Sequence, residues 1–185
     1  MTPTEADGGS ASFDADLRNL TDDERAAAAA DARRRQHWLH QQAADEGSLG
    51  GVLLDLGERK QLVALSTAGG RTLRGVIATM GTDFVGLRSP GSERVLVPLA
   101  AITAIRPEPG TTPTVGDRLV HVDASIGAVL HGLAAERPWV SLHTAAEDGA
   151  AGELRSVGQD VLVLRSLAGE ATYVPLATVT DVVVP

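Results

Sequence analysis

Two stretches of the chain begin with the same helical pattern of apolar residues. Each starts with a serine and continues with apolar side chains spaced three and four residues apart, which places them on one face of an α-helix. The positions are Leu49, Val52, Leu53 and Leu56 after Ser48, and Ile126, Val129, Leu130 and Leu133 after Ser125. The pattern therefore predicts two short amphipathic helices, each capped by its serine.

Short segments of alternating apolar and polar residues follow each predicted helix, separated by glycine and proline, and this pattern is typical of strands. The predicted strands are 62–67, 73–79, 83–88, 93–97 and 102–105 in the first stretch, and 139–144, 151–156, 160–165, 170–174 and 179–184 in the second. Gly69-Gly70 predicts a hairpin turn, and Pro-Leu-Ala after each fourth strand predicts a 3₁₀ turn. One helix followed by five short strands has the spacing of a small β-barrel.

The common pattern reflects an internal repeat. Residues 46–107 and 123–184 align without a gap at a shift of 77, and 21 of the 62 paired positions are identical. The identities are core and turn residues, and none forms a catalytic set. We predict a disordered leader at 1–20, a helix at 21–45, a first barrel at 46–107, a Pro/Gly linker at 108–122 and a second barrel at 123–185. Residues 118–122 fit either a short strand or the approach to the next helix.

Two segments of the first copy carry a resemblance to known proteins. Residues 70–77 (GRTLRGVI) and 97–105 (VPLAAITAI) resemble the Sm/SH3-type small barrels of Sm-like proteins, Hfq riboregulators and the C-terminal domain of RimP. Residues 179–184 (VTDVVV) resemble the last strand of Hfq, and the chain is also similar to tandem-repeat proteins of actinobacterial type.

The resemblance implies a mainly β fold with α: two tandem five-stranded Sm/SH3-like barrels, each preceded by a short helix, plus an N-terminal helix. Sm-type RNA sites carry an aspartate and an asparagine after a conserved glycine. Gly81 and Val85 occupy those places in the first copy, and Gly158 and Leu162 in the second. Asp83 and Asp160 follow two residues later, where we expect turn aspartates that bond backbone amides.

Composition argues against several classes of function. The chain has no cysteine, so disulfides, thiol nucleophiles and thiolate metal sites are excluded. It has no Gly-x-Ser-x-Gly, P-loop or dinucleotide-binding motif. His37 and His40 have a metal-binding spacing but no third ligand nearby, and His121, His131 and His143 are isolated along the chain. We therefore expect no cofactor, no metal and no enzymatic activity.

The sequence also bears on location. No apolar run approaches the length of a membrane helix. The first residues lack the basic segment and apolar stretch of a signal peptide. We expect a cytoplasmic protein without a membrane partner.

Charge differs between the two copies, although the whole chain carries −8. The first copy has seven basic and five acidic side chains, and the second has three and eight. Arg71 corresponds to Asp148 and Arg59 to Glu136. Opposite charge on equivalent surfaces favours attraction between a first and a second copy, within one chain or between chains.

The predicted helix at 21–45 begins with a capping box, Thr21 to Glu24, but has only a weak apolar stripe. Two interpretations remain open. The helix rests Trp38 and Leu39 on the first barrel, or it contacts a partner through Arg34, Arg35 and Trp38.

The favoured hypothesis for function is a non-enzymatic scaffold or interaction module. Its partners are its own barrels, a second chain in a homodimer, and an unidentified protein. The alternative is RNA binding through a basic face of the first barrel, and its contact residues are Arg59, Lys60, Arg71, Arg74, Arg88 and Arg94. An enzyme acting on a small molecule is the third hypothesis, and no catalytic set supports it.

Overall fold

A computed structural model describes residues 47–89, 91, 93–109, 118–146 and 148–184 of the protein. The chain divides into one unit up to Gly47 and a second from Ser48 to Pro185, and the account below concerns the second unit. The predicted leader, the helix at 21–45 with Arg34, Arg35 and Trp38, and most of the predicted linker lie outside the described residues.

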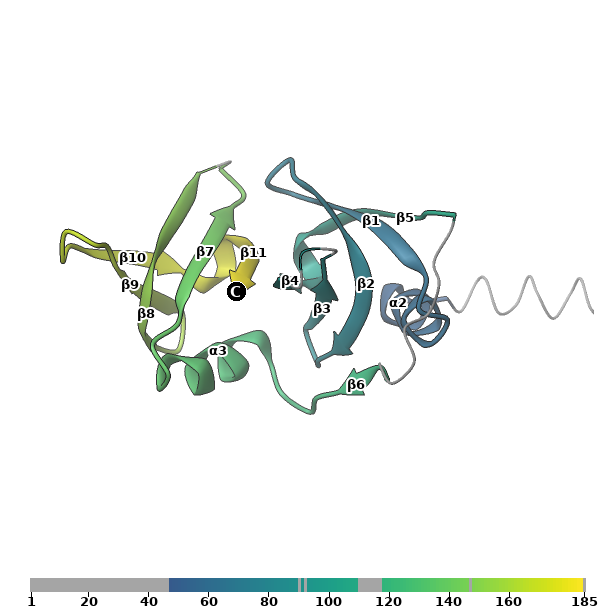
Figure 1. The fold of residues 1–185 in the computed structure, drawn as a ribbon, viewed down its shortest axis with the longest axis horizontal. Coiled ribbons are helices and arrows are strands. Elements are labelled where there is room, and N and C mark those ends of the chain that lie inside the picture. Colours follow the sequence, from purple (N-terminus) through teal and green to yellow (C-terminus); the bar gives the residue numbers. More distant parts are fainter. Residues whose placement is uncertain (1–46, 90, 92, 110–117, 147, 185) are drawn as a thin grey trace, which may run out of the picture. The chain divides into compact units, whose positions relative to one another are not determined.

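The described residues form a mainly β fold with two helices (Figure 1). The first half contains helix α2 (Leu49–Glu58) and strands β1 (Leu62–Thr67), β2 (Thr72–Met80), β3 (Phe84–Arg88), β4 (Arg94–Pro98) and β5 (Ile102–Pro107), with the 3₁₀ turn η1 (Leu99–Ala101) before β5. Strand β6 (Val120–His121) leads into the second half. That half contains α3 (Ile126–Ala134), β7 (Trp139–Thr144), β8 (Gly149–Val157), β9 (Val161–Arg165), β10 (Ala171–Pro175), η2 (Leu176–Thr178) and β11 (Val179–Val184). The predicted order of one helix and five strands in each copy is confirmed.

The same strand order is present in both halves. The first half has the order β5-β1-β2-β3-β4, and the second has the equivalent order β11-β7-β8-β9-β10. The two sets form one continuous sheet because β11 pairs with β4. Among the described strands, β10 and β5 lie at the two ends of this sheet. Strand β6 pairs in parallel with β2, which settles the open prediction for residues 118–122 in favour of a strand.

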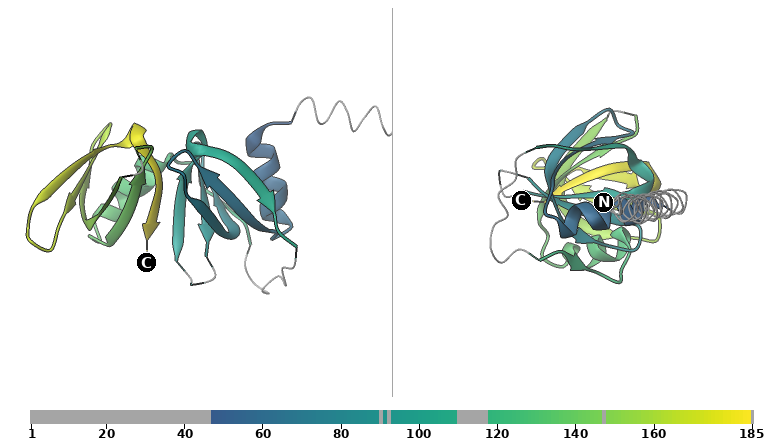
Figure 2. Two further views of the ribbon diagram at one scale, coloured as in Figure 1. Left: turned by 90° about the horizontal axis from the view of Figure 1, so that it is seen from above. Right: turned by 90° about the vertical axis from the view of Figure 1, so that its right-hand side faces the viewer.

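Both helices begin as the sequence predicts. The Ser48 side chain accepts a hydrogen bond from the Gly51 N–H at 3.1 Å, and the Ser125 side chain accepts one from the Ala128 N–H at 3.2 Å. Figure 2 shows α2 lying against the strands of the first half, where Leu53 is fully buried. The helices are therefore held by a serine cap at one end and by burial of one face.

A repeated glycine reflects a close approach between strands. A Cβ atom at Gly75 would lie 2.5 Å from the Arg88 carbonyl oxygen, and one at Gly152 would lie 2.7 Å from that of Arg165. Real Cβ atoms do not come so close to backbone oxygen. Glycine at this place lets β2 and β8 bend tightly against their neighbours in each half.

Candidate functional site

The two halves meet along an antiparallel ladder between β11 and β4, which we call the joint (Figures 1 and 2). Val182 lies opposite Leu96 and Val183 opposite Val95. Leu96 and Phe84 of the first half belong to the buried cluster of the second half. Since side chains of one half complete the core of the other, the joint is packed like a protein interior.

Three polar side chains, which we call the polar cluster, span the joint, and one of them, Asp181, is buried. Asp181 on β11 is 0% exposed, and its Oδ2 atom accepts hydrogen bonds from Nη1 of Arg71 and, at 3.0 Å, from Nδ1 of His143. Arg71 precedes β2 in the first half, whereas His143 lies on β7 in the second. A buried carboxylate is tolerated when a cation such as the Arg71 guanidinium and further hydrogen bonds pair with it, so the polar cluster favours the observed arrangement of the halves.

A glycine marks where a turn of the first half approaches the second half. A Cβ atom at Gly69 would lie 2.7 Å from the Thr144 carbonyl oxygen and 2.8 Å from Oγ1 of Thr180. The equivalent residue in the second half is Ala146, which is exposed. A side chain at Gly69 would therefore separate the β1–β2 turn from the second half.

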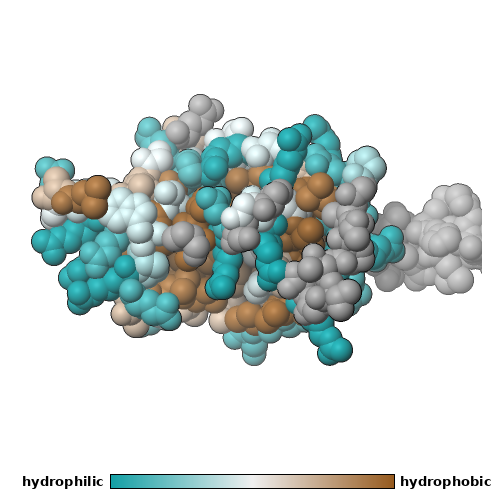
Figure 3. Space-filling model, viewed as in Figure 1, coloured by the Kyte–Doolittle hydropathy of each residue, from teal (hydrophilic) through white to brown (hydrophobic). Residues whose placement is uncertain are grey.

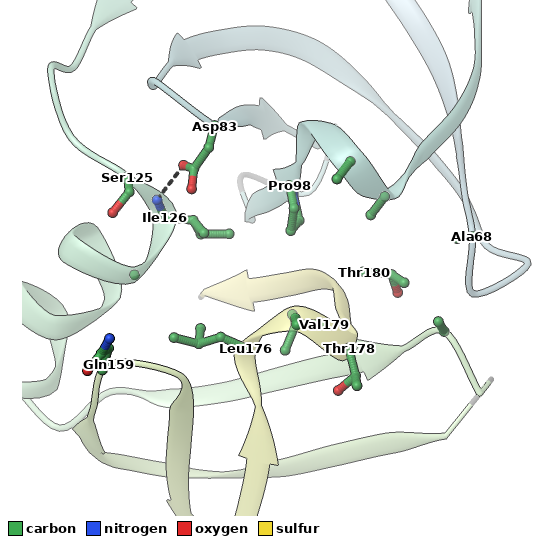
Figure 4. A pocket seen from close by; sticks show the side chains of 15 residues that line it. Ala68, Asp83, Pro98, Ser125, Ile126, Gln159, Leu176, Thr178, Val179 and Thr180 are labelled. Carbon is green, nitrogen blue, oxygen red and sulfur yellow. Dashed lines mark hydrogen bonds between the residues drawn. The ribbon is translucent and has the colours of Figure 1, made fainter.

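Asp83 makes a further bond across the halves. Its Oδ1 atom accepts a hydrogen bond at 2.7 Å from the N–H of Ile126, the first residue of α3 (Figure 4). The expectation that Asp83 bonds a backbone amide is confirmed, and the amide belongs to the other half. A carboxylate at this end of a helix also interacts favourably with the helix dipole.

A cavity of about 480 Å³ opens between the halves beside this bond (Figure 4). Small side chains and backbone form most of its wall. Among its lining residues the one ionisable side chain is Asp83, which is engaged with α3, and the Thr178 and Thr180 hydroxyls donate to backbone carbonyls. The hydroxyl of Ser125, also in the lining, accepts a hydrogen bond from the N–H of Ala128 at the start of α3. These polar groups therefore hold the local structure around the cavity.

No protein-family model matches the chain, and no curated protein matches it. Among the described residues, no group of three or more His, Asp or Glu side chains is placed to hold a metal ion. In the same part of the chain, no helix has the length and apolar character needed to cross a membrane.

Arg59, Arg71 and Arg74, which the sequence singled out, each have an acidic partner. Arg71 is paired with Asp181 in the polar cluster. Arg74 contacts Glu108 at 3.0 Å, and Arg59 contacts Asp55 at 2.8 Å. Each pair offsets part of the positive charge that the sequence assigned to this half.

The structure brings two of the other basic residues together. Arg88 on β3 and Arg94 on β4 lie directly opposite each other, and both are exposed. Both side chains therefore lie on the same face of the sheet. Lys60, with φ of 52°, occupies the turn between α2 and β1.

The sequence predicted association of the two barrels, but it did not identify the strands of the joint or two members of the polar cluster, Asp181 and His143. His143 is isolated along the chain, and its contact with Asp181 forms only in the fold. The available signal was Asp181, a charged residue within an apolar strand, at a place where the first copy has Ala104. The reversal from Arg71 to Asp148 was a second signal.

Proposed function

We propose that this protein is a non-enzymatic interaction scaffold built from two Sm-like five-stranded small barrels that associate edge to edge. The observation that carries the proposal is the joint, in which β11 of the second half pairs with β4 of the first. Scaffolds of this kind use a folded surface, not a reactive group, to bring chains together.

The burial at the joint supports a structural role for the pairing. Val182 and Phe84 are 1% exposed, and Asp181 is buried with its partners from both halves. Separating the halves would expose these residues to water, at a cost of about 25 cal/mol for each Å² of apolar surface. The two halves therefore act as one unit.

The equivalent strand order of the two halves supports the interpretation as small barrels. Each half has its fifth strand beside its first and its fourth strand at the far side. Each half also begins with a serine-capped helix and has a 3₁₀ turn before its last strand. The resemblance to Sm-like proteins rests on the same elements.

A cut between the halves tests the scaffold. A protease site introduced within residues 110–117 would be cleaved in the folded protein, and the product compared with uncut protein by size exclusion with light scattering. We expect the cleaved halves to elute together in native buffer, to melt in one transition, and to separate only in denaturant. Halves that separate in native buffer and melt independently would contradict the proposal.

RNA binding through the first half is the second candidate, and the Arg88–Arg94 pair is the observation that favours it. Their two guanidinium groups extend from neighbouring strands on the same face, and guanidinium is the side-chain group best suited to pair with a phosphate. The test is fluorescence anisotropy with a labelled single-stranded RNA across a range of salt concentrations. Binding that weakens steeply with salt and is lost in Arg94→Glu would support this candidate. Arg71→Glu is unsuitable as a test because it would also break the polar cluster.

A further inference from the structure

The two outer strands of the sheet are the counterparts of the two strands that form the joint. At the repeat shift of 77, β5 corresponds to β11, and β10 corresponds to β4. In the strand order of the described residues, β5 and β10 each have one neighbour, whereas β11 and β4 each have two. Among the described strands, one edge of each kind is thus paired with a strand of the other half, and its counterpart has no neighbour.

Burial differs accordingly between the equivalent strands. Leu96 on β4 is 9% exposed, and its counterpart Tyr173 on β10 is 70% exposed. Most of β11 is buried, whereas β5 has four exposed residues and two of intermediate burial. At the β10 end, Leu167 in the β9–β10 turn is also exposed, and a hydrophobic spot is visible there (Figure 3).

The backbone of both outer strands faces outward at the matching positions. The Leu176 N–H, just after β10, bonds toward β9, and the Glu108 N–H, just after β5, bonds toward β1. Because successive residues of a strand direct their backbone groups to opposite sides, Tyr173 and Ile105 direct theirs to the open edges. These two are the counterparts of Leu96 and Val182, which face each other in the joint.

We infer that the open edge of β10 binds the open edge of β5 of a second copy of this chain, in the register of the joint. The inference rests on the proposed function, because the joint is its template. Tyr173 of one chain then lies opposite Ile105 of the other chain. The Tyr173 ring is covered by that chain, as Leu96 is covered by β11 in the joint. Exposed, uncapped strand edges are sites where sheets add a further strand.

Differences between the copies specify which edges pair. At the outer contact, Asp148 of the chain that supplies β10 takes the place of Arg71. Ala104 of the other chain, which supplies β5, takes the place of Asp181. Ala104 brings no charge to the position that Asp181 occupies in the joint. An aspartate at position 104 would place a second carboxylate beside Asp148. The outer contact therefore accepts β5 and would reject a strand with the charge of β11.

The outer contact is weaker than the joint. Pro107 occupies in β5 the position that Val184 occupies in β11. Because proline has no backbone N–H, the chain that supplies β5 to the outer contact lacks one donor. The contact also lacks the ion pair of the polar cluster. We expect association that depends on protein concentration. Each contact uses the β10 edge of one chain and the β5 edge of another. An open assembly therefore still has one free edge of each kind, and it grows until a ring closes or a filament forms.

Sedimentation velocity on the full chain, over a wide concentration range, tests the inference with four proteins. The wild type should shift from 19.1 kDa to multiples of that mass. Ala104→Asp should weaken association by about tenfold or more. Asp148→Arg added to Ala104→Asp should restore association, because it rebuilds the pair seen between Arg71 and Asp181. Tyr173→Pro should abolish association, because it removes an outward N–H that the β9 ladder does not use.

Circular dichroism and melting curves confirm that each variant is folded. A wild-type chain that stays at 19.1 kDa at every concentration overturns the inference. Association unaffected by Ala104→Asp and by Tyr173→Pro also overturns it, since another surface would then be responsible. If the cleaved halves stay together while the whole chain remains a monomer, this inference fails and the scaffold proposal stands. If the cleaved halves separate, the scaffold proposal fails.

Discussion

Removing Arg71 should destabilise the protein more than removing Asp181, although the two are partners in one ion pair. Arg71→Ala leaves the Asp181 carboxylate fully buried with His143 as its remaining partner. An uncompensated buried charge costs about 3–5 kcal/mol, and the retained bond to His143 lowers the cost, so we expect a loss of about 2–4 kcal/mol.

Asp181→Ala has a smaller expected cost because of what it leaves behind. The Arg71 side chain is 36% exposed and can turn toward water once its partner is absent. The substitution also removes the buried Oδ1 atom of Asp181, which has no hydrogen-bond partner among the described residues. We therefore expect a loss of about 0–1.5 kcal/mol. Alanine is also the residue at the equivalent place in the first half.

Urea unfolding followed by far-ultraviolet circular dichroism measures both values. With a slope of about 2 kcal/mol per molar urea, Arg71→Ala should lower the midpoint by about 1–2 M without changing the slope. Arg59→Ala is the matched control, because Arg59 pairs with Asp55 on the exposed surface at 2.8 Å. It should change the free energy of unfolding by less than about 0.5 kcal/mol.

The double variant gives the sharper result. If the cost of Arg71→Ala comes from an orphaned carboxylate, then Arg71→Ala added to Asp181→Ala should cost little more than Asp181→Ala alone. The coupling energy of the cycle should then be close to the loss for Arg71→Ala, about 2–4 kcal/mol. Additive losses, or a larger loss for Asp181→Ala than for Arg71→Ala, would refute this reasoning.

Two further substitutions probe contacts between the halves. Gly69→Val should lower the free energy of unfolding, measured with urea, by about 2 kcal/mol or more. The reason is that a Cβ atom at position 69 would lie 2.7 Å from a backbone oxygen of the second half. Ala146→Val, at the equivalent exposed turn, is the control and should have little effect. Asp83→Ala should cost about 1 kcal/mol in thermal unfolding through loss of the 2.7 Å bond to the start of α3, and Asp160→Ala should be near neutral. Equal effects within either pair would contradict the assignment of these contacts.

The helices and strands followed from local signals. Periodicity, serine caps and turn residues predicted three strands with the observed ends, Leu62–Thr67, Trp139–Thr144 and Val179–Val184. Strand β8 is longer than predicted because Gly149 and Ala150 pair with β7. Small residues have weak strand preference, so that extension depends on the neighbouring strand and not on the residues themselves.

The joint had no such local signal. Both copies carry an apolar fifth strand and a fourth strand that ends in proline, so the periodicity of the two edges is the same. Which of the equivalent edges pairs depends on contacts between residues more than 80 positions apart, such as Leu96 with Val182. The distinguishing information was present only as differences between copies: Leu96 against Tyr173, and Ala104 against Asp181.

These differences also set the order of the two associations. The halves of one chain are covalently linked, so the joint forms at a high effective concentration and is already favoured over contacts between chains. The ion pair of Arg71 with Asp181 strengthens the joint further, while Pro107 weakens its counterpart at the outer edge. If the outer edges paired as firmly as the inner ones, newly made chains would join through whichever edge met first. A weaker outer contact lets each chain complete its own joint before it binds a second copy.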